Sequence, residues 1–207
     1  MAEVTKGIRS ILSLPRVYDA FMTVLGSDRS RRILIDEYMR PRPGNRILDI
    51  GCGTGAILNF LPQGIDYLGV DLNPEYVASA TRQHGGRARF RAADVNQLAS
   101  ETAERFDIIT GWGLLHHLED EEVSRLAKTV RNLLKAKGRF VTLDNCYAEG
   151  QSVVARKLIQ WDRGRNVRTA PQYEALIAEV FDQVRCVIRH DLLRVPYTHV
   201  IFEASLR

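Results

Sequence analysis

Cysteine is scarce in this 207-residue sequence, and its arrangement excludes several classes of protein. Cys52, Cys146 and Cys186 are an odd number and form no C-x-x-C pair, so the sequence predicts reduced thiols rather than a disulfide framework. No cluster of His, Cys and Asp has the spacing of metal ligands, and we expect no bound metal.

Long apolar runs are also missing, since no stretch approaches the roughly 20 residues that a membrane-spanning helix needs. The first residues show no apolar segment followed by a small-residue cleavage site. We therefore expect a cytoplasmic protein without a membrane partner. The 29 Lys and Arg against 25 Asp and Glu give a net charge of +4, which suits an anionic substrate. We expect a small-molecule acceptor that is anionic or sugar-like. Without a recognisable RNA-binding module, we expect no nucleic-acid partner.

The middle of the chain alternates short apolar strands with helices, which indicates an α/β fold with a parallel sheet. Asn73 followed by Pro74 is a strong helix start. The segment near residues 120–134 has one apolar face, an acidic first turn and a basic end, as an amphipathic helix does. Strands are predicted at residues 46–50, 67–70, 88–92, 106–110 and 139–143, with a helix after the first strand through Leu61 and an earlier helix from Ser27 or Asp28 to about Met39.

The C-terminal part has another pattern. Pro171 opens a helix, and strands follow near residues 184–190 and 198–204, with a connection too short for a helical crossover, so the pair should be antiparallel. We predict one α/β domain: a three-layer αβα sandwich with a seven-stranded, mostly parallel sheet, an antiparallel last strand and N-terminal helices covering the pocket. The sequence leaves a monomer and a homodimer open. The predicted parts are a helical cap (1–42), a cofactor-binding core (43–145), a lid (146–170) and a C-terminal helix with the strand pair (171–207).

Acidic residues end three of the predicted strands. Asp49 precedes a turn with the spacing G-x-G-x-G, whose glycines let the backbone approach a ligand, and it could pair with an ammonium group. The dinucleotide fingerprint is G-x-G-x-x-G instead. Asp71 ends the second strand, where a carboxylate can accept hydrogen bonds from ribose hydroxyls. Asp94 ends the third strand and could accept one from an adenine amino group.

These segments, in this order, resemble the class I, Rossmann-like S-adenosylmethionine-dependent methyltransferases. The resemblance covers about residues 45–145. It implies S-adenosylmethionine as the cofactor and an enzyme that transfers a methyl group. It rests on Ile47-Leu-Asp-Ile-Gly-Cys-Gly-Thr-Gly55, Gly69-Val-Asp-Leu-Asn73, Ala93-Asp-Val95, Phe106-Asp-Ile-Ile-Thr-Gly111 and Leu133-Leu-Lys-Ala-Lys-Gly-Arg-Phe-Val141.

The resemblance also implies which residues hold this cofactor. The glycine turn would line the methionine moiety, and the acids of the second and third strands would hold the ribose and the adenine edge. The end of the fourth strand would touch the cofactor, and an N-terminal tyrosine would close over it. The implied residues are Tyr18, Asp49, Gly51, Cys52, Gly53, Asp71, Leu72, Asp94, Val95, Gly111 and Trp112.

The segment Gly111-Trp-Gly-Leu-Leu-His-His-Leu118 resembles the small-molecule branch of the family. It lacks the Asn/Asp-Pro-Pro-Tyr form of enzymes that methylate planar amino groups. A histidine can take a proton from an acceptor hydroxyl near pH 7, so His116 or His117 is the candidate catalytic base. In the alternative, one histidine packs or caps the next helix while the other lines the pocket, because transfer from a sulfonium does not require a strong base.

Weaker candidates for substrate contact lie beyond this segment. Asp144 and Asn145 follow the fifth strand and should face the pocket. Arg163 belongs to a basic stretch, residues 156–168, which forms either a lid over an anionic substrate or a solvated basic face. The predicted function is methyl transfer to an O, N or C atom of a small molecule. The rival interpretations are a methyltransferase acting on RNA or protein, a catalytically silent cofactor-binding protein of this fold, and a nicotinamide-dependent oxidoreductase.

Overall fold

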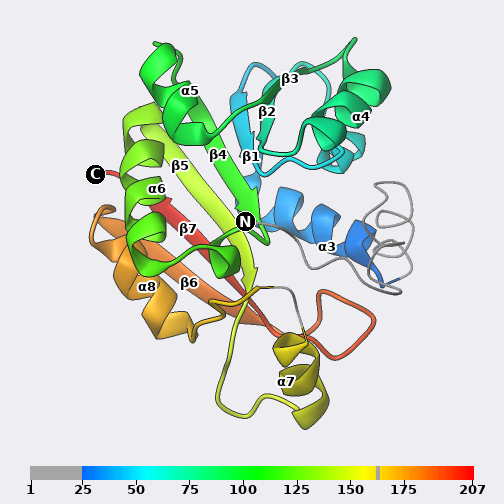
Figure 1. Cartoon of the computed structure of the whole chain (residues 1–207), viewed down its shortest axis with the longest axis vertical. Helices are drawn as coiled ribbons and strands as arrows, with labels where there is room; N and C mark the ends of the chain where they lie inside the picture. The colour runs from blue at the N-terminus through cyan, green and yellow to red at the C-terminus, as the bar shows by residue number, and fades with distance from the viewer. Residues whose placement is uncertain (1–24, 162–163) are drawn as a thin grey trace.

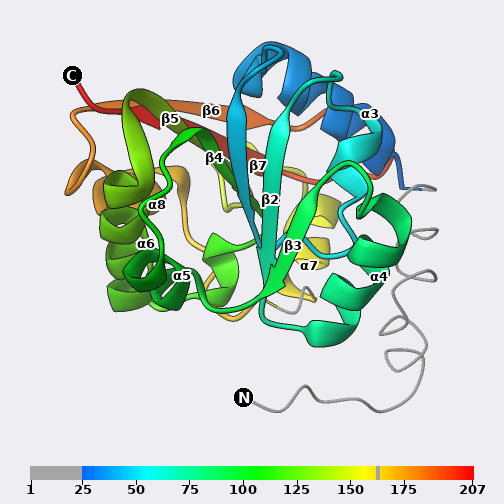
Figure 2. The same cartoon turned by 90° about the horizontal axis from the view of Figure 1, so that it is seen from above.

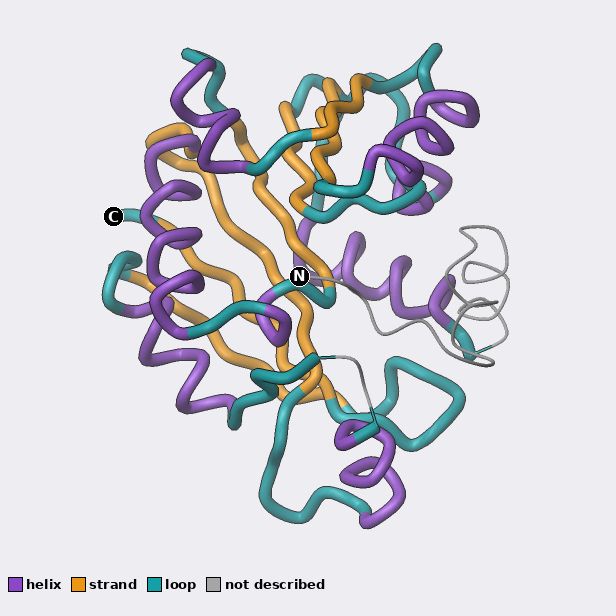
Figure 3. Tube along the Cα trace, viewed as in Figure 1, coloured by secondary structure: helices purple, strands orange, loops and turns teal. Residues whose placement is uncertain are grey.

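A seven-stranded sheet lies at the centre of the computed structural model, which describes residues 25–161 and 164–207 (Figures 1 and 3). The strand order is β3-β2-β1-β4-β5-β7-β6. The five strands from β3 to β5 run parallel, whereas β7 is antiparallel to both of its neighbours, which confirms the predicted sheet. The strands are β1 (Arg46–Ile50), β2 (Asp66–Asp71), β3 (Arg89–Ala92), β4 (Phe106–Trp112), β5 (Leu134–Asn145), β6 (Gln183–Arg189) and β7 (His199–Ser205).

Helices cover both faces of the sheet (Figure 2). On one face lie α5 (Val95–Glu101), α6 (Asp120–Leu133) and α8 (Ala170–Ala178). The other face carries α3 (Ser27–Ile33), the π-helix η1 (Leu34–Met39), the 3-10 helix η2 (Ala56–Asn59) and α4 (Pro74–His84). The 3-10 helix η3 (Leu115–His117) follows β4, and α7 (Val153–Gln160) lies beyond the end of β5 (Figure 1).

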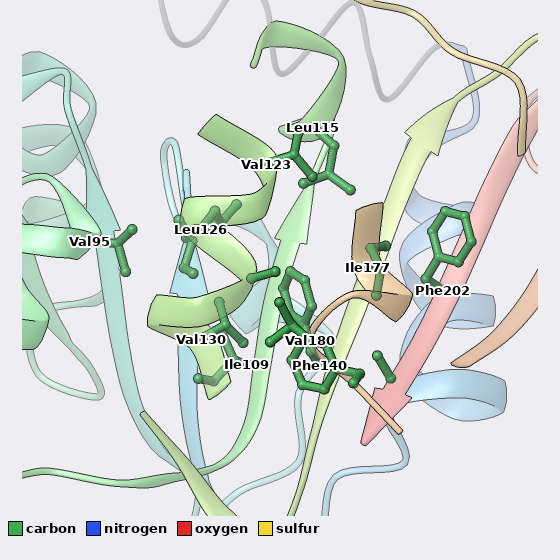
Figure 4. Close-up of a cluster of buried hydrophobic side chains, with 14 of the residues drawn as sticks. Val95, Ile109, Leu115, Val123, Leu126, Val130, Phe140, Ile177, Val180 and Phe202 are labelled. Carbon is green, nitrogen blue, oxygen red and sulfur yellow. The ribbon is translucent and has the colours of Figure 1, made fainter. Parts of the chain in front are cut away.

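Two apolar clusters hold these three layers together, because successive strand residues point to opposite faces. In β1, Ile47 packs on the η1 side and Leu48 on the α6 side, and Ile108 and Ile109 repeat this division in β4. Figure 4 shows the α6 side, where the apolar stripe of the helix meets the sheet. The predicted amphipathic helix is therefore confirmed. Its side chains Val123, Leu126 and Val130 lie in one apolar cluster with Ile109 of β4 and Phe140 of β5.

Several predicted helix limits were wrong. The helix expected through Leu61 is a single 3-10 turn, which begins after Gly55 in a left-handed conformation (φ 73°) and ends at Asn59. The helix expected from Ser27 or Asp28 to about Met39 does end at Met39, but it begins after Gly26 without a side-chain cap, and it widens into a π-helix from Leu34. The basic residues expected at the end of α6 lie partly in β5, which begins at Leu134.

Two further helices were not predicted individually. Asp94 caps α5, whose seven residues show little apolar periodicity, and α7 lies within the predicted lid. The helices expected before residue 25 lie outside the described residues. Within the described ranges, no helix is both long and apolar enough to cross a bilayer.

Candidate functional site

The candidate site lies where the carboxyl ends of β1, β2, β3 and β4 meet. The strand order reverses direction between β1 and β4, and open parallel sheets bind ligands outside such a switch point. The pairing aligns Asp49 with Thr110 and Asp71 with Ala92, so the acids of β1 and β2 reach the same edge. The predicted convergence of strand ends is confirmed.

The loop after β1 has a backbone that requires glycine. Gly51, Gly53 and Gly55 all adopt left-handed conformations, with φ angles of 72°, 54° and 73°. A Cβ atom at Gly69 in β2 would lie 2.8 Å from Cys52 Sγ, so the neighbouring strand leaves room for this loop. Burial raises the pKa of the Cys52 thiol, which makes this cysteine a packing group rather than a nucleophile.

Asp71 connects the end of β2 to the glycine loop. Its Oδ2 accepts a hydrogen bond from the Gly53 N–H at 2.9 Å, and its Oδ1 accepts one from the Asn73 N–H at 2.8 Å. A carboxylate offers about four acceptor positions, so these bonds orient the group and leave positions for ribose hydroxyls. Leu72 is 74% exposed beside it, as a residue flanking an adenine would be.

Asp49 is a buried carboxyl group at the end of β1. Its Oδ2 accepts a hydrogen bond from the Tyr67 hydroxyl at 2.6 Å. Burial raises the pKa of Asp49 to about 7, and the negative charge of Asp71 adds to this rise, while the Tyr67 hydrogen bond opposes it. Such a site favours a cationic ligand, which would stabilise the ionised carboxylate.

The ends of β3 and β4 place fewer side chains at the candidate site than the ends of β1 and β2 do. Asp94 is exposed at the end of β3, but its Oδ1 caps α5 through the Asn96 N–H at 2.7 Å. Val95 turns its side chain into the α6-side core, so that side chain does not line the predicted adenine edge (Figure 4). At the end of β4, the buried indole N–H of Trp112 makes no hydrogen bond to a described residue. Gly111 lies beside it, where a Cβ atom would meet Leu114 Cδ2 at 3.0 Å.

The two histidines of η3 occupy different environments. His116 is buried, and its Nδ1 lies 2.8 Å from Asp144 Oδ1, which also accepts the His116 backbone N–H at 3.1 Å. His117 is exposed, and its ring centroid lies 4.1 Å from that of His116. Burial raises the pKa of Asp144, and the hydrogen bond from His116 opposes this rise. The structure therefore fixes one imidazole by a carboxylate and leaves the other at the surface.

The predicted substrate contacts need correction. The Asp144 side chain is 0% exposed and binds His116, so it supports a histidine and does not face an acceptor. Asn145 is buried as well, and its Nδ2 donates to the Tyr197 hydroxyl at 3.0 Å. Both side chains are buried against other parts of the chain: Asp144 against η3, and Asn145 against Tyr197. Tyr18 and Arg163 lie outside the described residues.

Arg168 is a structural residue that the sequence does not single out from its basic stretch. It is only 7% exposed, and its guanidinium donates to the carbonyl oxygens of Leu115 and Leu118 at 3.2 and 2.8 Å. It also binds Asp120 Oδ1 at 2.5 and 2.7 Å. Arg168 thus attaches the segment before α8 to both ends of the histidine turn, the name used here for residues 115–118.

Comparison with known proteins agrees with this geometry. A family model described as a methyltransferase domain matches residues 47–138, from β1 into β5. Residues 47–138 of the chain are therefore similar to a methyltransferase domain. The matched range holds the glycine loop, Asp71, Asp94 and both histidines of η3.

Two curated proteins are similar to this part of the chain. A ubiquinone biosynthesis O-methyltransferase of Bordetella avium is 36% identical over 91 residues, which is 42% of this chain and 37% of that protein. A juvenile hormone acid O-methyltransferase of Bombyx mori is 31% identical over 107 residues, which is 48% of this chain and 38% of that protein. The chain thus matches less than half the length of these relatives.

A solved structure extends the similarity over nearly the whole chain. The plantazolicin methyltransferase BpumL, in complex with a triazolic desmethylPZN analog and SAH, superposes with a TM-score of 0.69 at 18% identity. The superposition covers 96% of this chain and 94% of that one. At this identity the likeness concerns the fold, which extends beyond the matched residues 47–138 to the C-terminal strand pair.

Proposed function

We propose that this protein transfers a methyl group from S-adenosylmethionine to an atom of a small molecule. The observation that carries the proposal is the closeness of the glycine loop to Leu114, the residue that leads into η3. Leu114, two residues before His116, has its Cδ1 3.7 Å from the position that a Cβ atom of Gly51 would take. A cofactor held by the loop and an acceptor beside His116 would therefore be neighbours.

The charges and hydrogen-bonding groups of the site fit this cofactor. S-adenosylmethionine carries an ammonium and a sulfonium, and a cation beside Asp49 would compensate a buried carboxylate whose pKa is raised to about 7. Asp71 is oriented by two backbone N–H groups toward the ligand-binding edge, and the Trp112 indole N–H is buried without a described partner. When bound, the cofactor supplies an electrophilic methyl group.

The histidine turn supplies a base for an acceptor that must lose a proton. Because Asp144 Oδ1 accepts from the backbone N–H of His116, the same oxygen favours the tautomer of His116 with a proton on Nδ1. The lone pair then resides on Nε2, which can take a proton from an acceptor hydroxyl as the methyl group moves. Asp144 also stabilises the imidazolium that results. We therefore assign the base to His116 and a covering position to His117.

An oxygen atom of a small molecule is the acceptor that we propose. The curated relatives are named as O-methyltransferases of ubiquinone biosynthesis and of juvenile hormone acid, which supports this choice. An oxygen acceptor also gives the Asp144–His116 pair a task, because a hydroxyl must lose its proton on methylation whereas many nitrogen and carbon acceptors do not need this histidine.

The test combines binding with turnover. Calorimetric titration with S-adenosylmethionine should give saturable binding to the full chain, and mass spectrometry should detect methylation within a panel of phenols and carboxylic acids. We expect His116→Asn to lower kcat at least tenfold with unchanged cofactor affinity, and His117→Asn to change kcat little. Asp71→Ala should weaken cofactor binding by roughly 1.5–3 kcal/mol for each charge-assisted hydrogen bond lost.

Three results would contradict this assignment. Absence of cofactor binding at high micromolar concentration would refute the function itself. Cofactor binding without turnover on any acceptor class would support a silent protein of this fold. A loss of kcat confined to His117→Asn would move the base to the exposed histidine.

A further inference from the structure

The outward face of α7, defined here as Val153, Val154, Lys157 and Trp161, has no part in the proposed reaction. Its three apolar side chains are 71%, 55% and 72% exposed. Among the described residues, only two other large apolar side chains are exposed: Leu72 beside the glycine loop, at 74%, and Ile188 on β6, at 41%. Exposed apolar side chains that gather on one short element indicate an interaction surface.

Helical geometry explains why these residues share one face. Val153, Lys157 and Trp161 are spaced by four residues, so they lie one above another along α7, and Val154 borders this row. The helical turn continues to Trp161, whose N–H donates to the Lys157 carbonyl at 3.1 Å. The opposite face is used for packing, with Ala155 and Ile159 buried.

Positively charged residues lie near the apolar row in the sequence. Between residues 150 and 168 the sequence has five Lys and Arg against the single acid Asp162. Of these cations, Arg168 is buried and bound to Asp120, whereas Arg156, Lys157 and Arg165 are exposed. Arg156 extends over the ring of Tyr147 at 5.4 Å, on the chain that leads into α7. The surface therefore combines an indole, two valines and several cations.

We propose that the outward face of α7 docks on an anionic lipid surface. Tryptophan favours the boundary between headgroups and hydrocarbon, valines can enter that boundary, and Lys and Arg are attracted by anionic headgroups. A nucleic acid would pair with the cations but leave the valines in water. A second copy in a symmetric contact would bring the Lys157 side chains of both copies together.

The helix α7 lies on the same side of the molecule as the candidate site (Figure 1). The helix lies beyond the carboxyl end of β5, the edge at which Asp144 supports the histidine turn (Figure 1). A bilayer bound there would face the acceptor side of the site. The sequence led us to expect no membrane partner. It could not reveal this surface, because the exposure of the side chains on an eight-residue helix is known only from the folded chain. The contact proposed is peripheral and does not rest on methyl transfer.

Flotation of the full chain with vesicles tests the proposal. Vesicles of phosphatidylcholine alone are compared with vesicles that contain phosphatidylglycerol, at low and high salt. We expect binding to the anionic vesicles only, reduced by salt, together with a blue shift of tryptophan emission. Trp161→Ser and Lys157→Gln should each lower the bound fraction several-fold. Their matched controls, Ile188→Ser on β6 and Lys128→Gln on α6, also alter exposed residues and should not change it.

The variants lie at the surface, and thermal unfolding confirms that each is folded. Failure of the unaltered chain to float with anionic vesicles would overturn the proposal, and so would equal losses in the control variants. Binding to RNA without binding to vesicles would assign the cations to nucleic acid instead. A dimer in solution that Trp161→Ser dissociates, again without vesicle binding, would assign the face to a second copy.

Discussion

At the scale of single residues, the buried carboxyl group of Asp49 lowers the stability of the fold when it is ionised. Its pKa is about 7 in the folded protein against 3.8 in an exposed reference state. The folded chain therefore holds this proton more tightly than the unfolded chain, and stability falls as pH rises from about 4 to 7. Above pH 7 the ionised Asp49 lowers the free energy of unfolding by a constant amount, about 4 kcal/mol.

Asp49→Asn removes this titration. We expect the variant to gain stability relative to the unaltered protein as pH rises from 5.5 to 8, by about 2 kcal/mol over that interval, because the amide carries no proton to lose. Urea unfolding at both pH values measures the difference. The same variant should bind S-adenosylmethionine more weakly at pH 8. An unchanged stability gap between the two pH values would show that Asp49 titrates normally.

The contact between His116 and Asp144 could not be predicted from the sequence. The motif names both histidines as candidates, but it does not distinguish them. The distinction comes from a partner 28 residues away, at the end of the neighbouring strand. The acids Asp49, Asp71 and Asp94 were easier to place, because parallel strands bring their carboxyl ends to one edge whatever the details of packing.

At the scale of elements, strands and long amphipathic helices could be predicted and short elements could not. The stripe of α6 and the Asn73-Pro74 start of α4 are local signals that survive folding. The seven residues of α5 are set by the Asp94 cap and by packing on α6, neither of which gives a clear period in the sequence. Arg168 belongs to a basic stretch, and only the fold selects it for burial.

Arg168 joins the segment before α8 to the histidine turn, so its removal should loosen both elements. We expect Arg168→Met to lower the free energy of unfolding by about 1–3 kcal/mol, since it leaves carbonyl oxygens of Leu115 and Leu118 without their donor. Hydrogen exchange should accelerate at the Asn166 N–H, which donates to the His116 carbonyl at 3.0 Å. Arg165→Met, an exposed change in the same segment, is the control and should leave both measurements unchanged. Protection at Asn166 that persists in Arg168→Met would contradict this coupling.

At the scale of the whole molecule, one sheet edge gathers groups that are far apart in the chain. The glycine loop, the β2 acid and the histidine turn occupy the carboxyl ends of β1, β2 and β4, and β5 supports them from the side. The fold could be predicted because this order of strands and helices admits few arrangements. The packing of η3 against Asp144 and against the segment before α8 depends on long-range contacts, which no sequence motif encodes.

A ligand that binds this edge must stabilise the entire domain, because its contacts come from several strands and exist only in the folded chain. At a concentration one hundred times its Kd, S-adenosylmethionine or its demethylated product should add about 2.7 kcal/mol to the free energy of unfolding. For a domain of this length, that corresponds to a rise in Tm of about 5–11 °C. Differential scanning fluorimetry with increasing ligand measures the rise, and Asp71→Ala should require a higher ligand concentration for the same shift. NADH at the same concentrations should leave Tm unchanged, because the loop has G-x-G-x-G spacing in place of the dinucleotide fingerprint. A shift with NADH and none with S-adenosylmethionine would favour the nicotinamide-dependent oxidoreductase.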